Sequence, residues 1–161
     1  YNSSPQSTVS ESGDNYNCNF SSGNCTVSKN FTFNKVDSNF SLTLNLHGST
    51  DTISAISVVP ASLSSIKITE TNSEGAPGVT AANCEELTSC DYFAFGYDTY
   101  NNNIDGASFT CNWDDAGADS TLSNTTNSHG TSVTVGLDSP INLTCTVGAV
   151  NETVVITVTT P

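Results

Sequence analysis

The sequence predicts an all-β protein, a β-sandwich preceded by an extended N-terminal tail. Apolar and polar residues alternate with a period of two in segment after segment, and β-branched and aromatic residues are enriched there. Polar turns rich in Gly, Asn and Asp separate these segments. Helical periodicity is nearly absent, and about nine short strands of this kind are typical of a sandwich or barrel.

The first 16 residues, YNSSPQSTVSESGDNY, differ from the rest of the chain. Val9 is their one aliphatic residue, so they contribute little to any core. We expect residues 1–16 to form a disordered or extended tail. The remaining length suits one ordinary domain, so we expect residues 17–161 to form a single sandwich.

The alternation is clearest in residues 39–46, NFSLTLNL, where Phe40 and three leucines face one way and polar residues face the other. Residues 30–36 and 141–147 repeat the pattern. The other expected strands are residues 52–59, 63–69, 91–97, 107–113, 131–137 and 152–159. The segment 85–87 is expected to form one helical turn.

Six cysteines in a sequence with few charges indicate disulfides, and six cysteines allow 15 pairings. Cys18 and Cys25 bracket one short segment, and Cys84 and Cys90 bracket another, so each pair is suited to a local bridge. A zinc site is disfavoured because the sequence has no CxxC and its two histidines are far apart.

The remaining cysteines, Cys111 and Cys145, suit a long-range bridge. Phe109, Cys111 and Trp113 share the apolar face of one expected strand, and Cys145 lies on the apolar face of another. Both sulfurs would then point into one core, as a bridge between two packed sheets requires. Such a bridge closes a loop of roughly 35 residues.

Asn-x-Ser/Thr sequons occur eight times, and each can accept an N-linked glycan if the chain is exported. Three of them, at Asn30, Asn39 and Asn142, lie on the polar faces of expected strands, where a glycan would not cross the core. The full set of expected sites is Asn2, Asn19, Asn24, Asn30, Asn39, Asn124, Asn142 and Asn151.

The charge balance argues against partners that are themselves anionic. The chain has 16 acidic residues, three lysines and no arginine, a formal net charge of −13. It therefore lacks the cationic patch that nucleic acid or anionic lipid requires. Only 12% of residues are charged, so solubility would come from hydroxyls, amides and glycans. Such a surface suits a harsh medium, for example an acidic one, and no apolar run is long enough to span a membrane.

The residues for catalysis are sparse, and we expect neither an enzyme nor a metal or cofactor site. His47 and His129 lack the neighbours of a triad, and the adjacent acids suit solvated turns. Calcium is the alternative, because two loops are rich in carboxylate and amide oxygens. Those loops contain Asp98, Asn101, Asn102 and Asp105 in one case, and Asp114, Asp115 and Asp119 in the other.

Aromatic residues cluster in the second half of the chain and suit either a core or a sugar-binding platform. They are Tyr92, Phe93, Phe95, Tyr97, Tyr100 and Trp113. Trp113 follows an inward cysteine, which favours the core. A true immunoglobulin domain is disfavoured, because Trp113 is only two residues past Cys111 and the Cys111–Cys145 separation is short.

The polar N-terminal tail, the Ser-, Thr- and Asn-rich β body, the dense sequons, the expected disulfides and the scarcity of Lys and Arg occur together along the whole chain. In this overall character the chain resembles the thread pilins of thermoacidophilic archaea, which build thin, glycosylated surface filaments. The resemblance implies an immunoglobulin-like or pilin-like sandwich that lacks a strand. It also implies an extracellular filament of identical subunits that serves adhesion or cell contact.

In such threads the tail of one subunit completes the sheet of the next, head to tail. For this chain the resemblance implies a donor strand within residues 1–16, with Val9 as its apolar plug. The acceptor strands would be residues 30–46 and 152–159, and the groove of the latter would contain Val154, Ile156 and Val158. A glycan on Asn2 would be difficult to accommodate in that groove.

Two other functions remain open from the sequence. One is a viral or cell-surface glycoprotein ectodomain that binds a receptor, and the other is a secreted carbohydrate-binding or carbohydrate-degrading protein. A filament subunit differs from both because it polymerises, and because loss of its tail prevents polymerisation.

Overall fold

The computed structural model describes residues 9–19, 24–46, 49–116, 119–137 and 140–161. Strands dominate these residues, and the one helical element among them is a single 3₁₀ turn, η1 (Gly106–Ser108). The predicted all-β class is therefore confirmed.

The chain forms two compact units, Tyr1–Pro60 and Ala61–Pro161. This differs from the expected single domain after a 16-residue tail. Every strand pairs only with strands of its own unit, so each unit has its own sheets. Pro60, which lacks a backbone N–H, stands at the boundary.

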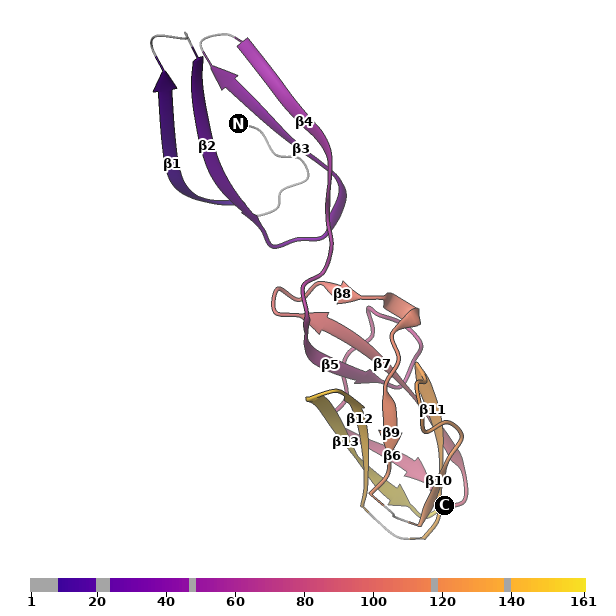
Figure 1. Ribbon diagram of the computed structural model, residues 1–161. Coiled ribbons are helices and arrows are strands. Elements are labelled where there is room, and N and C mark those ends of the chain that lie inside the picture. The colour runs from indigo at the N-terminus through magenta and orange to yellow at the C-terminus, as the bar shows by residue number, and fades with distance from the viewer. Residues whose placement is uncertain (1–8, 20–23, 47–48, 117–118, 138–139) are drawn as a thin grey trace. The chain divides into compact units, whose positions relative to one another are not determined.

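The first unit consists of two antiparallel hairpins (Figure 1). One joins β1 (Val9–Asn19) to β2 (Asn24–Phe33), and the other joins β3 (Asp37–Leu46) to β4 (Ser49–Val58). The register of the first hairpin gains one residue at Gly13 in β1. The register of the second hairpin shifts twice, by one extra residue in β3 between Asp37 and Phe40 and by one in β4 around Ala55. Ala55 has a positive φ of 58°, a bulge conformation that costs a non-glycine residue energy.

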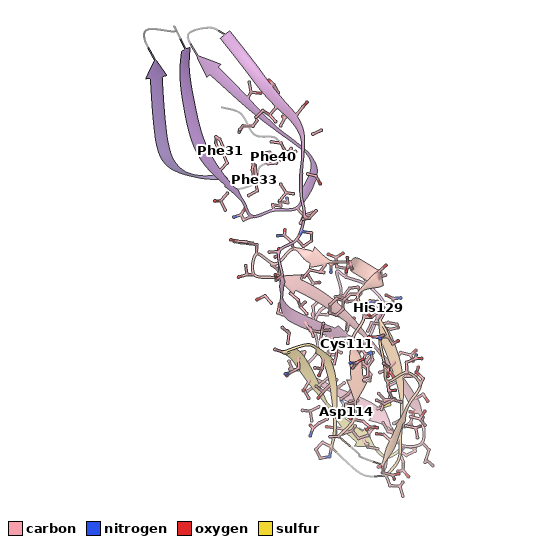
Figure 2. The ribbon with its side chains drawn as sticks, viewed as in Figure 1. Phe31, Phe33, Phe40, Cys111, Asp114 and His129 are labelled. Carbon is pink, nitrogen blue, oxygen red and sulfur yellow. A yellow bond between two sulfur atoms is a disulfide. The ribbon has the colours of Figure 1, made fainter. Side chains whose placement is uncertain are left out.

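The described side chains of the first unit bury little apolar surface. Among residues 31–36, 40–43 and 52–60, Phe40 is the only buried one. Its ring meets that of Phe33 edge to face, with centroids 4.6 Å apart (Figure 2). This aromatic contact joins the end of β2 to β3 across the short connection between the hairpins.

The second unit is a sandwich of a five-stranded and a four-stranded sheet. The first sheet has the order β10 (Ser120–Leu122), β11 (Gly130–Val135), β7 (Ser89–Asp98) and β5 (Leu63–Thr69). A short strand, β8 (Asn103–Ile104), also pairs with the end of β7. The second sheet has the order β6 (Ala81–Glu85), β13 (Val150–Thr159), β12 (Ile141–Val147) and β9 (Asn112–Asp114).

The order of these strands is that of an immunoglobulin sandwich. In the letters used for that fold, β5 and β6 are the two halves, A and A′, of a divided first strand. With β8 left out, the later strands β7 and β9 to β13 are then B to G. The first sheet has the order D-E-B-A and the second the order A′-G-F-C. β6 pairs in parallel with β13, whereas the other ladders of the sandwich are antiparallel.

The alternation in the sequence correctly identifies the inward faces. Ile141, Leu143 and Cys145 are each 0% exposed, and the residues between them face outward. The predicted apolar face of 107–113 is also buried, although this segment forms η1 and the short β9 rather than one strand. Trp113 lies in the core and donates its indole N–H to the carbonyl of Ser128 at 3.1 Å.

Two of the three expected cysteine pairs form disulfides, Cys84–Cys90 and Cys111–Cys145. Their roles are the reverse of those expected. Cys84 lies in β6 and Cys90 in β7, so the short bridge joins the two sheets. Cys111 precedes β9, and β9 and β12 are neighbours in one sheet, so the long-range bridge links adjacent strands.

Residues 85–87 do not form the expected helical turn. β6 ends at Glu85, and a tight turn follows in which Leu87 has a φ of 61°.

Cys18 and Cys25 are directly opposite each other in the β1–β2 ladder. Their side chains lie outside those that the structure describes, so the local bridge stays a prediction that the register favours.

Candidate functional site: open strand edges

The predicted acceptor groove in the C-terminal strand does not lie at a sheet edge. β13 is an inner strand, paired with β12 on one side and with β6 on the other. Val154 and Ile156 are fully buried in the core, and Val158 packs against it. The expectation that 152–159 is an edge strand is therefore wrong, because β6 fills the position that a donor strand would take.

The predicted donor is partly paired within its own chain. Val9 begins β1 and lies opposite Phe33, and the ladder continues to Asn19 opposite Asn24. Residues 9–16 thus form half of a hairpin rather than a free tail. Residues 1–8, including the sequon at Asn2, lie outside the described residues.

The longest unpaired strand edges belong to the first unit. Its four strands are 10 or 11 residues long, and each has one partner in the described ladders. In the described ladders each strand therefore has one edge without a strand partner. A two-stranded hairpin is only marginally stable by itself in water, since three or more strands are normally needed.

The edges of the sandwich are shorter or covered. β9 and β10 have three residues each and β6 has five. The outer edge of β5 is covered in part, because the N–H of Val79 donates to the carbonyl of Ile68 at 2.8 Å. Short, covered edges are the usual protection against unwanted strand pairing.

Exposed apolar side chains also occur in the first unit, on β4 and in the segments beside its strands. In the first unit Val36 is 40% exposed, Ile53 61% and Val59 73%. Leu87 and Leu137 in the second unit are similarly exposed, so exposure alone does not distinguish the units. Only the first unit combines such residues with long unpaired strands and a core of few described residues.

The sequons with described side chains lie at the surface of the second unit. Asn142 in β12 and Asn151 in β13 are exposed on the outer face of one sheet, as expected for Asn142. The hydroxyls of their sequon threonines, Thr144 and Thr153, bond each other at 2.9 Å. Asn124 is exposed in the segment after β10. Asn19, Asn24, Asn30 and Asn39 lie on strands of the first unit, but their side chains lie outside the described set.

The loop suspected of binding calcium has a different internal use. Asp98 is 3% exposed, and its carboxylate accepts bonds from the backbone N–H groups of Ala61, Tyr100 and Asn102. The side-chain amide of Asn102 donates a fourth bond at 2.9 Å. These N–H donors occupy both carboxylate oxygens, so Asp98 clamps a turn to the first residue of the unit.

The second acidic loop and the histidine also make internal contacts. Asp115 accepts a bond from the Ser120 hydroxyl, and Asp119 accepts one from the N–H of Leu137. Both ring nitrogens of His129 are bonded, to the carbonyl of Phe109 and to the side chain of Asn72, each at 3.0 Å. His47 lies outside the described residues. Within the described parts of the chain, no group of three or more His, Cys, Asp and Glu side chains could hold a metal ion.

The aromatic cluster divides between core and surface. Tyr92 and Trp113 belong to the core, and Phe95 and Tyr97 are buried. Burial, with a smaller contribution from Glu70, raises the pKa of Tyr92 to about 12, so its hydroxyl stays neutral. Phe93 is half-buried and lines a hollow, and Tyr100 is 51% exposed. The expected preference for the core thus holds for four of the six residues.

A scan against protein-family models finds none that matches the chain, and a search of curated proteins finds no significant match. Among the described residues there is no helix long and apolar enough to cross a membrane.

Proposed function

We propose that this chain is a structural subunit of an extracellular filament, and that it polymerises head to tail with identical subunits by strand addition. The proposal rests chiefly on the first unit, which presents four long strand edges without partners in the described ladders. A further strand from a neighbouring copy would pair along such an edge and cover apolar surface.

A second copy of the chain is the partner that best fits these edges. Strands of the first unit have the length to pair with their counterparts, and in the described ladders each has one edge without a strand partner. A head-to-tail contact that does not close on itself produces a filament. The acceptor in this proposal is the 30–46 region, since β13 already has two partners.

The donor in this proposal includes Val9 and begins in the N-terminal segment. Because residues 9–19 pair with β2 within the chain, either β1 exchanges its partner on assembly or the intact hairpin adds its outer edge. Exchange would require the β1–β2 ladder to open. Addition of the outer edge would leave that ladder in place.

An extracellular location, which such a filament implies, agrees with the disulfides of the chain. Two disulfides are typical of proteins outside the reducing cytosol. The role proposed is adhesion or cell contact, without catalysis or a cofactor. N-linked glycans would cover the exposed faces that carry Asn124, Asn142 and Asn151.

Two matched variants test the proposal. Ile53→Asp places a charge on β4 opposite Leu42 of the proposed acceptor region, at a side chain that is 61% exposed. Leu137→Asp places the same charge at a 67% exposed position of the sandwich. We expect Ile53→Asp to raise the concentration needed for assembly about tenfold, the effect of ~1.4 kcal/mol per contact. Leu137→Asp should assemble like the wild type. Filaments are counted by electron microscopy, and monomer is measured by size-exclusion chromatography.

Equal effects of the two substitutions would contradict the assignment of the contact to the first unit. A wild-type protein that stays monomeric at high concentration, with no fibres in the microscope, would contradict the filament itself.

The second candidate is a glycosylated ectodomain that binds a receptor or a carbohydrate. The immunoglobulin-type strand order favours it, because such sandwiches commonly serve as cell-surface modules. It requires no polymerisation, so the wild-type measurement above separates the two candidates.

A further inference from the structure

A shallow hollow of about 300 Å³ lies on the outer face of the sheet that contains β7 and β11. This volume is at the lower end of the range for small-molecule pockets, so the hollow suits a single sugar ring rather than a larger ligand. Its lining residues are Asp91, Phe93, Ser123, Asn124, Gly130, Thr131 and Ser132.

The lining has the chemistry that recognises a pyranose sugar. Phe93 is half-buried and gives one flat apolar wall, against which the C–H face of a sugar can pack. Asp91 lies beside it, and one of its carboxylate oxygens accepts a bond from the Ser132 hydroxyl. The second oxygen is an acceptor for a sugar hydroxyl or amide.

Asn124, the acceptor residue of a sequon, is itself part of this lining. Its side-chain nitrogen, the atom that would carry a glycan, lies 3.3 Å from the carbonyl oxygen of Gly130. Gly130 is directly opposite Phe93 in the β11–β7 ladder. The attachment atom therefore lies at the wall of the hollow that Phe93 forms.

Gly130 keeps that wall open. A Cβ at this position would lie 2.7 Å from the Phe93 ring and 2.9 Å from the carbonyl oxygen of Tyr92, so any side chain would displace the ring. The sequon is also held in place, because the backbone N–H of Asn124 donates to the buried Thr131 hydroxyl at 3.3 Å. The preceding Ser123 bonds Ser132 twice, through its N–H and through its hydroxyl.

The other described sequons have different neighbours. Across the β12–β13 ladder Asn142 is opposite Val155, and Asn151 is opposite Thr146. Neither pair includes an aromatic side chain, so a glycan at these two positions would project from the sheet. Asn124 alone among the three lines a hollow with an aromatic wall.

We propose that the first sugar of a glycan on Asn124 packs in this hollow against Phe93, with Asp91 as its polar contact. The glycan would then be part of the folded sandwich rather than a projecting chain. The inference requires export to a glycosylating compartment, as proposed above, but not polymerisation, so the two proposals can fail separately.

A double-mutant cycle in a host that N-glycosylates tests this. Thr126→Ala removes the sequon and leaves Asn124 in place, and Phe93→Leu removes the flat ring while keeping an apolar side chain. We expect Thr126→Ala to lower the Tm by about 4 °C in the wild-type background and to have little effect in Phe93→Leu. Asn151→Gln, the matched loss of a projecting glycan, should leave the Tm unchanged. Mass spectrometry of glycopeptides gives the occupancy of each site.

An unoccupied Asn124 in a protein whose other sequons are occupied would overturn the inference. Occupancy of Asn124 with the same Thr126→Ala effect in both backgrounds would also overturn it.

Binding of free sugar shows whether the hollow holds the Asn124 glycan or a sugar taken up from solution. In protein made without glycans, millimolar N-acetylglucosamine should shift the NMR signals of Phe93, Thr131 and Ser132. In protein glycosylated at Asn124 these shifts should disappear, because the hollow is already filled. Equal shifts in both proteins would show that the hollow takes a free sugar and not the Asn124 glycan, which overturns the inference.

Discussion

Asp98 illustrates how a single acidic residue can serve stability in a chain with many of them. Its carboxylate is buried, which by itself would raise its pKa. Hydrogen bonds from the Asn102 side chain and from the N–H groups of Ala61, Asn102 and Tyr100 outweigh that burial and lower the pKa to about 2. The group therefore remains ionised in media acidic enough to protonate an ordinary carboxyl group.

The first prediction concerns Asp98→Asn. The pKa of Asp98 falls from 3.8 to about 2 on folding, so the unfolded chain binds more protons between these values. The contribution of ionised Asp98 to the free energy of unfolding is fully present above about pH 4 and is lost as the pH falls towards 2. We expect Asp98→Asn to destabilise the second unit at pH 7 and to flatten the decline in stability between pH 4 and pH 2.

Fluorescence of Trp113 measures this effect directly. It is the single tryptophan of the chain and lies in the core of the second unit, so its signal follows that unit during denaturant unfolding. The matched control is Asp114→Asn, which removes an exposed carboxylate (Figure 2). An Asp98→Asn protein that loses as much stability as the wild type between pH 4 and pH 2 would show that the clamp does not carry the acid response.

At the scale of the strand, the sequence predicts faces better than partners. Alternation correctly identifies β12 and its buried side, because that side packs on one core. It does not indicate β1, whose polar residues form a ladder through backbone bonds that leave no apolar pattern. It also does not indicate that β6 occupies the edge of β13, since parallel pairing joins residues about 74 positions apart through their main chains.

For the disulfides too, the sequence predicts the cysteine pairs but not the sheets that they join. Positions in the sequence favour the pairs Cys84–Cys90 and Cys111–Cys145, and both form. Which pair joins the sheets depends on the assignment of β6, β7, β9 and β12 to sheets, and the local pattern does not contain that assignment. The candidate assembly edges depend on the same assignment, so the local pattern does not show that the C-terminal strand, which the resemblance implies to be open, lies between β6 and β12.

The second prediction compares the two bridges. In the chain-entropy model a loop closed across 34 residues contributes about 3.8 kcal/mol and one closed across six about 2.2 kcal/mol. We therefore expect Cys111→Ala with Cys145→Ala to destabilise the second unit more than Cys84→Ala with Cys90→Ala. Denaturant unfolding followed by Trp113 fluorescence gives both values.

Replacement of both partners in each variant leaves no free thiol that could mispair. If the Cys84 and Cys90 variant proves the less stable one, the connection between the sheets outweighs loop length. The short bridge would then be the main covalent support of the sandwich.

At the scale of the whole molecule, charge is distributed unequally between the units. Residues 1–60 contain four acidic residues and two lysines, a formal charge of −2. Residues 61–161 contain twelve acidic residues and one lysine, a formal charge of −11. The proposed contact between first units therefore joins the less charged parts, while the second units repel one another at neutral pH.

The third prediction follows from that repulsion. Salt at 0.5 M shortens the range of electrostatic interaction to about 4–5 Å, and at about pH 3 most exposed carboxylates are protonated. We expect either change to lower the concentration needed for assembly relative to pH 7 and low salt. Light scattering and electron microscopy measure this concentration. We expect Ile53→Asp to stay impaired at pH 7 in low and in high salt, and to recover in part at pH 3, where the introduced carboxyl group is itself mostly protonated. If salt instead dissolves the filaments, attraction between the lysines of the first unit and the acidic second unit must hold them together, and strand addition between first units would be wrong.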